Sequence, residues 1–126
     1  MDCQTFNEIV KERLEKCTAL LVPKGEEYAR NGDRLHNFKV TARIDGETPE
    51  KALWGMWKKH ITSVKDMIDD VENGKIPTDK MLDEKICDMI NYSLLLEGLF
   101  KERMINEKRD IETEKWAERI TNEVKK

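Results

Sequence analysis

The chain has 126 residues, 39% of them charged and 38% apolar, with a formal net charge of −3, which suits one domain of long, solvated helices better than a disordered chain. The pI near 5.5 and the absence of a basic patch argue against binding to a nucleic acid polymer. The three cysteines are widely spaced and include no Cys-x-x-Cys pair, which argues against a disulfide framework and a zinc site. The sequence has no signal-peptide pattern and no apolar run of ~20 residues, which argues against secretion and a membrane span. We therefore expect a cytoplasmic protein.

The first predicted helix begins at Thr5, which forms a capping box with Glu8, and apolar residues recur after it at helical spacing. We expect this helix to end at Pro23 and Gly25, because proline and glycine commonly terminate helices. A polar loop follows.

A second helix is predicted after the Asn31-Gly32 turn, with Asp33 as its N-cap and an end near residues 45–46. Its buried face should consist of Leu35, Phe38 and Ala42.

The third predicted helix spans residues 49–73. Thr48, Pro49 and Glu50 supply an N-cap, a proline at the first helical position and an acidic first turn, and Gly74 closes the helix. Its apolar stripe consists of Leu53, Trp57, Val64, Met67, Ile68 and Val71.

The fourth predicted helix starts after Thr78 and extends at least to Phe100. We expect a further helix in the charged tail, where Trp116, Ile120 and Val124 form a narrow apolar stripe. This stripe should pack against the body or a second copy. The predicted fold is an all-α antiparallel bundle of four to five helices in one domain over residues 1–126, with its core at about 5–102 and a C-terminal helix at about 103–126. The core face of the fourth helix should consist of Leu82, Ile86, Met89, Leu96 and Phe100.

Polar side chains interrupt an apolar strip of the fourth helix. Spacings of four and three place Glu84, Asp88 and Asn91 on one side of that helix. Carboxylates removed from water are costly unless they are paired or bound to a cation, and Mg²⁺ favours oxygen ligands and phosphate substrates. The alternative is an amphipathic edge whose acids are partnered by Lys80 or Lys85.

Two other segments carry groups suited to a site. His60 lies near the centre of the apolar stripe of the third helix and is either a core side chain or a catalytic one. Lys59 points about 100° away from it and suits a solvated face, unless a substrate lies along that edge of the helix. The loop after the first helix holds acidic, amide and aromatic groups that suit metal or base contacts, or is simply an exposed polar loop. Tyr28, Trp54 and Trp57 are candidates for stacking on a nucleobase.

These segments, in chain order, resemble the all-α nucleotide pyrophosphohydrolase group, which includes the MazG-like and dimeric dUTPase-like enzymes, and within it the nucleotide modification associated domain proteins that bacteriophages often encode. The resemblance covers about residues 20–102. It is carried by Lys24-Gly-x-Glu27-Tyr28, Asp33-Arg34-Leu35-x-Asn37-Phe38, Lys59-His60 and Glu84-Lys-x-x-Asp88-x-x-Asn91-Tyr92.

The resemblance implies a magnesium-dependent hydrolase in which water attacks a nucleoside triphosphate and pyrophosphate is released. Glu27, Glu84 and Asp88 would bind Mg²⁺, Lys59 would neutralise phosphate charge, and His60 or Asn91 would orient the water or the base. It also implies a dimer or tetramer whose sites are completed at helix interfaces. The expected substrate contacts are Lys24, Tyr28, Asp33, Arg34, Asn37, Lys59 and Tyr92.

The sequence departs from the MazG pattern at one position. The full motif begins Glu-Glu-x-x-Glu, whereas here Glu26-Glu27 is followed by Arg30. An arginine at this position would replace a metal ligand with a phosphate contact, which favours a second hypothesis, a non-catalytic phage protein that binds or sequesters a nucleotide. A third is a structural or interaction helix bundle whose inward acids are paired with lysines.

Overall fold

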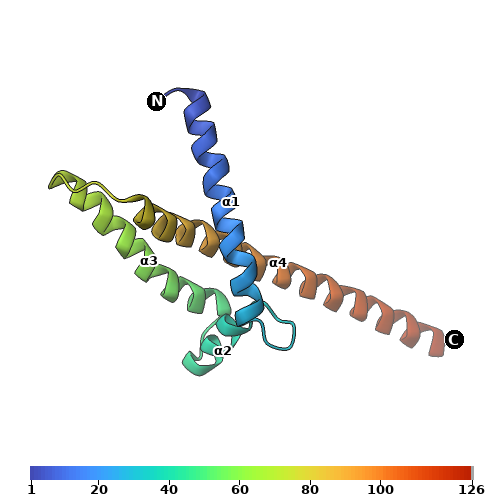
Figure 1. Cartoon of the computed structure of the whole chain (residues 1–126). Coiled ribbons are helices and arrows are strands. Elements are labelled where there is room, and N and C mark those ends of the chain that lie inside the picture. The colour runs from blue at the N-terminus through green and yellow to red at the C-terminus, as the bar shows by residue number, and fades with distance from the viewer. Residues whose placement is uncertain (126) are drawn as a thin grey trace.

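The computed structural model describes residues 1–125 and is all-helical, as predicted. Figure 1 shows α3 folding back beside the first half of α4, while α1 crosses α4 and α2 lies at the start of α3. The N-terminal half of α1 and the C-terminal half of α4 extend away from the other helices (Figure 1). The helices are α1 (Cys3–Tyr28), α2 (His36–Asp45), α3 (Pro49–Glu72) and α4 (Asp79–Val124).

Helix α1 differs from its predicted bounds at both ends. Its N-cap is Asp2, whose side chain accepts a hydrogen bond from the Thr5 amide at 2.7 Å, so the predicted start at Thr5 is wrong. The predicted end is also wrong, because the helix continues through Pro23 to Tyr28. A proline keeps φ close to the helical value but has no N–H group, so α1 lacks one backbone hydrogen bond at this position without ending there.

The loop and α2 follow the predicted pattern with one correction. Asn31 and Gly32 have positive φ angles of 56° and 75°, which gives the predicted turn. Helix α2 begins at His36 with Leu35 as its N-cap, so Asp33 is not the cap; its carboxylate accepts a hydrogen bond from the Leu35 amide at 3.0 Å instead. The predicted inner face is confirmed by the burial of Leu35, Phe38 and Ala42.

Helix α3 begins as predicted, with the Thr48 hydroxyl accepting a hydrogen bond from the Lys51 amide at 3.3 Å. Leu53 and Met67 of its stripe are buried, but Ile68 and Val71 are 62% and 53% exposed. The predicted apolar stripe is therefore buried only in part. Helix α2 covers only the beginning of α3, and α4 alone lies beside its end (Figure 1), which leaves much of the last turns in solvent.

Helix α4 is one continuous helix, so the prediction of a separate tail helix is wrong. The sequence after Gly98 has neither glycine nor proline to interrupt it. Residues 103–125 are all exposed, and Trp116 does not pack against the body. Phe100 is also exposed, whereas Cys87, Asn91 and Leu99 are the buried residues of α4.

The central apolar cluster joins α2, α3 and α4. Leu35, Phe38, Leu53 and Leu99 form its buried part, and Trp57 packs on it from the side. Along the described chain, no helix has an apolar stretch long enough to cross a membrane.

Candidate functional site

A cavity of about 670 Å³ lies beside this cluster and is lined by side chains from all four helices and from the loop between α1 and α2. Its volume falls in the range of roughly 300–1,000 Å³ that is usual for small-molecule sites. One part of the wall is apolar, and the rest carries cationic, acidic and amide groups. This combination suits a ligand with both an aromatic and a charged portion.

The cavity brings together most of the residues singled out from the sequence, although they come from distant segments. Glu27, Asp33 and Lys59 are not part of its lining. Glu27 and Lys59 are exposed, and the carboxylate of Asp33 pairs with the Lys39 ammonium group at 2.7 Å. The predicted residues that line the cavity are Lys24, Tyr28, Arg34, Asn37, His60, Glu84, Asp88, Asn91 and Tyr92.

Basic side chains gather where α1 meets the following loop. Lys24, Arg34 and His36 all line the cavity at this side. Gly25 allows the close approach of Arg34, since a Cβ atom at position 25 would lie 2.7 Å from the guanidinium Nε. A glycine inside a helix costs about 0.5–1 kcal/mol relative to alanine, and here its absent side chain provides the space for a cation.

The acidic part of the wall belongs to α4. Glu84 and Asp88 stand one turn apart, and the Asp88 carboxylate lies 3.1 Å from Nδ1 of His60 on α3. This contact orients the imidazole, as a carboxylate does for histidines in many active sites. Glu84 is more exposed and lies 3.4 Å from the Lys85 ammonium group, in line with the alternative of an amphipathic edge for that residue.

Tyr92 connects the acidic side with the aromatic residues of α3. Its ring stacks on Trp57 with centroids 6.4 Å apart, and its centroid lies 4.8 Å from that of His60. Burial and the charge of Asp88 raise the pKa of the Tyr92 phenol, so its hydroxyl stays protonated at neutral pH. Trp54 and Trp57 are not in the cavity lining, so of the predicted stacking residues only Tyr28 borders the cavity.

Asn91 is buried at the junction of α1 and α4. Its Nδ2 donates a long hydrogen bond of 3.4 Å to the Cys17 carbonyl, which sets the orientation of the amide. The Oδ1 atom is buried and has no hydrogen-bond partner within residues 1–125. An unsatisfied buried acceptor is costly and uncommon in folded proteins. The amide is therefore the polar group in the wall that most lacks a partner.

Sequence reasoning missed several residues of the lining. Thr41 lies one turn after Asn37 on α2, and Met56 lies one turn before His60 on α3. Helical spacing from the predicted residues is a signal that would have found both. Leu21 of α1 also contributes, one turn before Gly25.

The acidic residues fit magnesium only in part. Among the residues that the structure describes, no three His, Cys, Asp or Glu side chains are grouped for a metal ion. Mg²⁺ is nevertheless often held by one or two carboxylates, with waters and substrate phosphates completing its coordination. Glu84 and Asp88 fit an ion that arrives with a phosphorylated ligand better than one held by protein alone.

Comparisons with protein-family models, curated proteins and solved structures find no match for this chain. The lining of the cavity combines the cationic side chains of Lys24 and Arg34 with the carboxylates of Glu84 and Asp88.

Proposed function

We propose that the protein is a magnesium-dependent nucleoside triphosphate pyrophosphohydrolase of the MazG-like kind, acting on a free or modified nucleotide. The observation that carries this proposal is the pairing of basic and acidic walls in one cavity. Lys24 and Arg34 lie on one side, and Glu84 and Asp88 line the same space. The proposed reaction converts a nucleoside triphosphate and water into a monophosphate and pyrophosphate.

The basic wall supports phosphate binding. A guanidinium group binds phosphate through two parallel hydrogen bonds, and an ammonium group acts as a mobile point charge. Arg34 and Lys24 supply these groups from the loop and the last turns of α1. In this arrangement they take the role of phosphate neutralisation that the sequence assigned to Lys59.

The acidic wall supports water activation. Glu84 and Asp88 would hold Mg²⁺, which when bound polarises phosphate oxygens and lowers the pKa of a coordinated water. His60 faces Asp88 with Nδ1, so Nε2 is the ring nitrogen left to orient the attacking water. The protonated Tyr92 hydroxyl is a further donor beside it, and the amide of Asn91 suits a contact with the base.

A non-catalytic nucleotide-binding protein is the second candidate. Glu27 lies outside the cavity lining, and Asp88 is already paired with His60. A site with two carboxylates, one of them paired, is poorer in metal ligands than the three-carboxylate site that the resemblance implies. Such a protein would bind the phosphates through Lys24 and Arg34 without turnover.

A screen of nucleotides tests both candidates. The purified chain is heated with common and modified nucleoside triphosphates, with and without magnesium, and each stabilising mixture is analysed by chromatography. A magnesium-dependent rise in melting temperature together with monophosphate and pyrophosphate supports the hydrolase. Stabilisation with intact ligand supports the binder, and no response to any nucleotide contradicts both.

We also infer that the chain forms a homo-oligomer, a dimer or tetramer. The apolar face of α1 that packs on α4 around Cys17 continues toward the N-terminus, where Phe6, Ile9 and Leu14 are 56%, 46% and 50% exposed. The C-terminal half of α4 likewise exposes Trp116. A second copy offers the same apolar faces and covers both without another kind of partner.

A further inference from the structure

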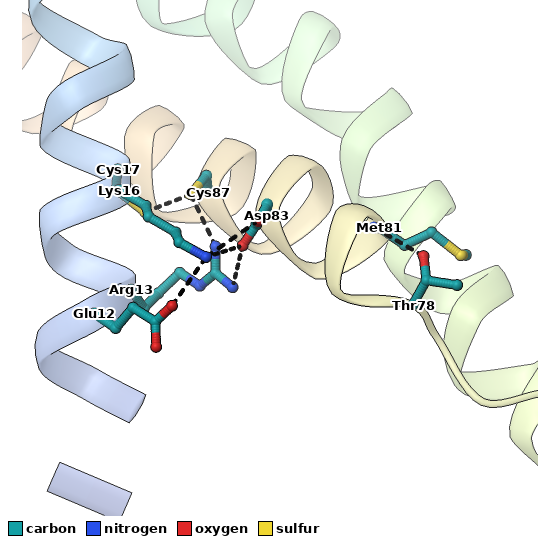
Figure 2. A network of polar contacts seen from close by, with 8 residues as sticks. All are labelled: Glu12, Arg13, Lys16, Cys17, Thr78, Met81, Asp83 and Cys87. Carbon is teal, nitrogen blue, oxygen red and sulfur yellow. Dashed lines mark hydrogen bonds and ion pairs between the residues drawn. The ribbon is translucent and has the colours of Figure 1, made fainter. Parts of the chain in front are cut away.

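Two thiols that are far apart in the sequence meet where α1 crosses α4 (Figure 2). Sγ of Cys17 lies 2.8 Å from Sγ of Cys87, and each residue is 1% exposed. In a disulfide the two sulfur atoms are about 2.05 Å apart. Both cysteines are free, so a small movement of either side chain brings the sulfurs to bonding distance.

The surroundings of the two sulfur atoms differ. Cys87 Sγ accepts a hydrogen bond from Arg13 Nη1 at 3.2 Å as well as one from the Cys17 thiol. The guanidinium is held in place by Asp83, 2.9 Å away (Figure 2). Burial raises the pKa of the Cys17 thiol to about 12, so this residue remains protonated. Thiols next to a guanidinium are the ones that become nucleophilic, which assigns the attacking sulfur to Cys87.

We propose that Cys17 and Cys87 form a redox site, which hydrogen peroxide oxidises to a disulfide between α1 and α4. Cys87 Sγ attacks one peroxide oxygen, the O–O bond breaks, and one water leaves as the sulfenic acid forms. Cys17 Sγ then displaces the hydroxyl group as a second water, and the S–S bond forms. Peroxide gains the two electrons that the thiols lose, and both thiol protons end in water.

The burial of the pair restricts which oxidants reach it. Hydrogen peroxide is about as small as water, whereas glutathione disulfide is a large, charged peptide. Thiol–disulfide exchange requires a direct approach to the sulfur, and two residues that are each 1% exposed do not offer it. The exposed Cys3 lacks this protection. Peroxide therefore acts on the pair, and glutathione disulfide acts on Cys3.

The disulfide would fix one wall of the cavity. Helix α1 packs mainly against α4, and its residues Leu21, Lys24 and Tyr28 line the cavity beyond Cys17. The Cys17 carbonyl also holds the amide of Asn91. A covalent link at this crossing prevents α1 from separating from α4. The oxidation depends only on the two thiols and Arg13, so it stands or fails independently of the proposed nucleotide hydrolysis.

The test uses the full chain with Cys3→Ser, which removes cross-linking between molecules. After peroxide treatment, the intact mass should fall by two hydrogen atoms, and digestion should yield a peptide pair joined through Cys17 and Cys87 that separates on reduction. The melting temperature should rise, because the bond closes a long loop in the unfolded chain. Glutathione disulfide should react at least tenfold more slowly than peroxide at equal concentration.

Two variants in this background test the assigned roles. Arg13→Gln should slow cross-linking by peroxide about tenfold, and Arg13→Lys should restore most of the rate, which a merely structural role of Arg13 would not explain. Both thiols remaining free, or separate sulfinic acids without a cross-link, at peroxide concentrations that oxidise an exposed cysteine peptide would overturn the proposal. Equal rates with peroxide and glutathione disulfide would also contradict it.

Discussion

At the scale of single residues, Asp88 is the side chain on which the proposed hydrolysis most depends, because it faces the cavity and contacts His60. Replacing Asp88 with asparagine removes the negative charge that orients the imidazole and would hold Mg²⁺. We expect kcat to fall on the order of 100-fold or more, while the helical signal in circular dichroism stays unchanged because the amide keeps the shape of the side chain.

The matched control for this substitution is Asp69→Asn. Asp69 is an aspartate on α3 that pairs with Lys65 at 2.9 Å on an exposed surface, outside the cavity lining. Its replacement should leave turnover within twofold of the parent. If Asp88→Asn retains full magnesium-dependent turnover, the assignment of Asp88 to the reaction is incorrect.

Gly25 provides a second test at this scale, through the position of Arg34. In Gly25→Ala, the new Cβ atom would stand 2.7 Å from Nε and 3.0 Å from Cδ of Arg34, so the Arg34 side chain must shift away from its present position. Nucleotide affinity, measured by calorimetry, should fall about tenfold, the loss expected for a charge-assisted hydrogen bond.

Gly55→Ala is the control for Gly25→Ala, because nothing lies within 4 Å of the Cβ position at this other helical glycine. Alanine there should raise the free energy of unfolding by about 0.5–1 kcal/mol through its better helix propensity and leave affinity unchanged. Equal affinities for the two alanine variants would show that Arg34 does not contact the ligand.

At the scale of elements, an acid-sensitive contact connects the loop before α2 with α2 and α4. Lys39 Nζ lies 2.7 Å from Asp33 and 2.6 Å from Glu102. The hydrogen bond from Lys39 and one from the Leu35 amide keep the pKa of Asp33 below its ordinary value of 3.8. A carboxyl group with a lowered pKa stabilises the fold above its ordinary pKa, and this contribution is lost as the pH falls through the lowered value.

The melting temperature should therefore decrease as the pH is lowered from about 5 to below 3, and Asp33→Asn should show a smaller decrease than the parent. At pH 7 the variant should melt at a lower temperature, because the neutral amide leaves Lys39 with a single carboxylate partner. Circular dichroism melts over this pH range provide the measurement. A parallel pH dependence in parent and variant would mean that other carboxyl groups account for acid unfolding.

Helical spacing predicted the elements better than their ends. The buried face of α2 and the caps of α3 follow from short local patterns, so they were predictable. The continuation of α1 past Pro23 was not, because proline and glycine are typical of helix ends, and Arg34, which approaches Gly25, comes from another segment. The exposure of Ile68 was equally hidden, because an apolar stripe shows which face a helix can bury and not whether a neighbour covers it.

At the scale of the whole molecule, the cavity was partly predictable because its residues cluster in short motifs. Spacing alone places the acidic side chains on one face of α4. Spacing within a helix does not predict which residues of different helices meet. Glu27 neighbours Tyr28 in the sequence yet lies outside the lining, and Cys17 and Cys87, which are 70 residues apart in the sequence, meet only because α1 crosses α4.

That crossing also leaves the first turns of α1, before Arg13, without a neighbouring helix among the described residues (Figure 1). If a second copy covers this face, replacing Ile9 and Val10 with glutamate places two charges in an apolar interface and should convert the oligomer to a monomer. Light scattering after gel filtration measures the mass of each form. Ile76→Glu is the control, since Ile76 is 80% exposed in the turn between α3 and α4, and it should keep the parent mass. A monomeric parent chain at micromolar concentration would refute the inferred oligomer, and the exposed faces of α1 and α4 would then need a different partner.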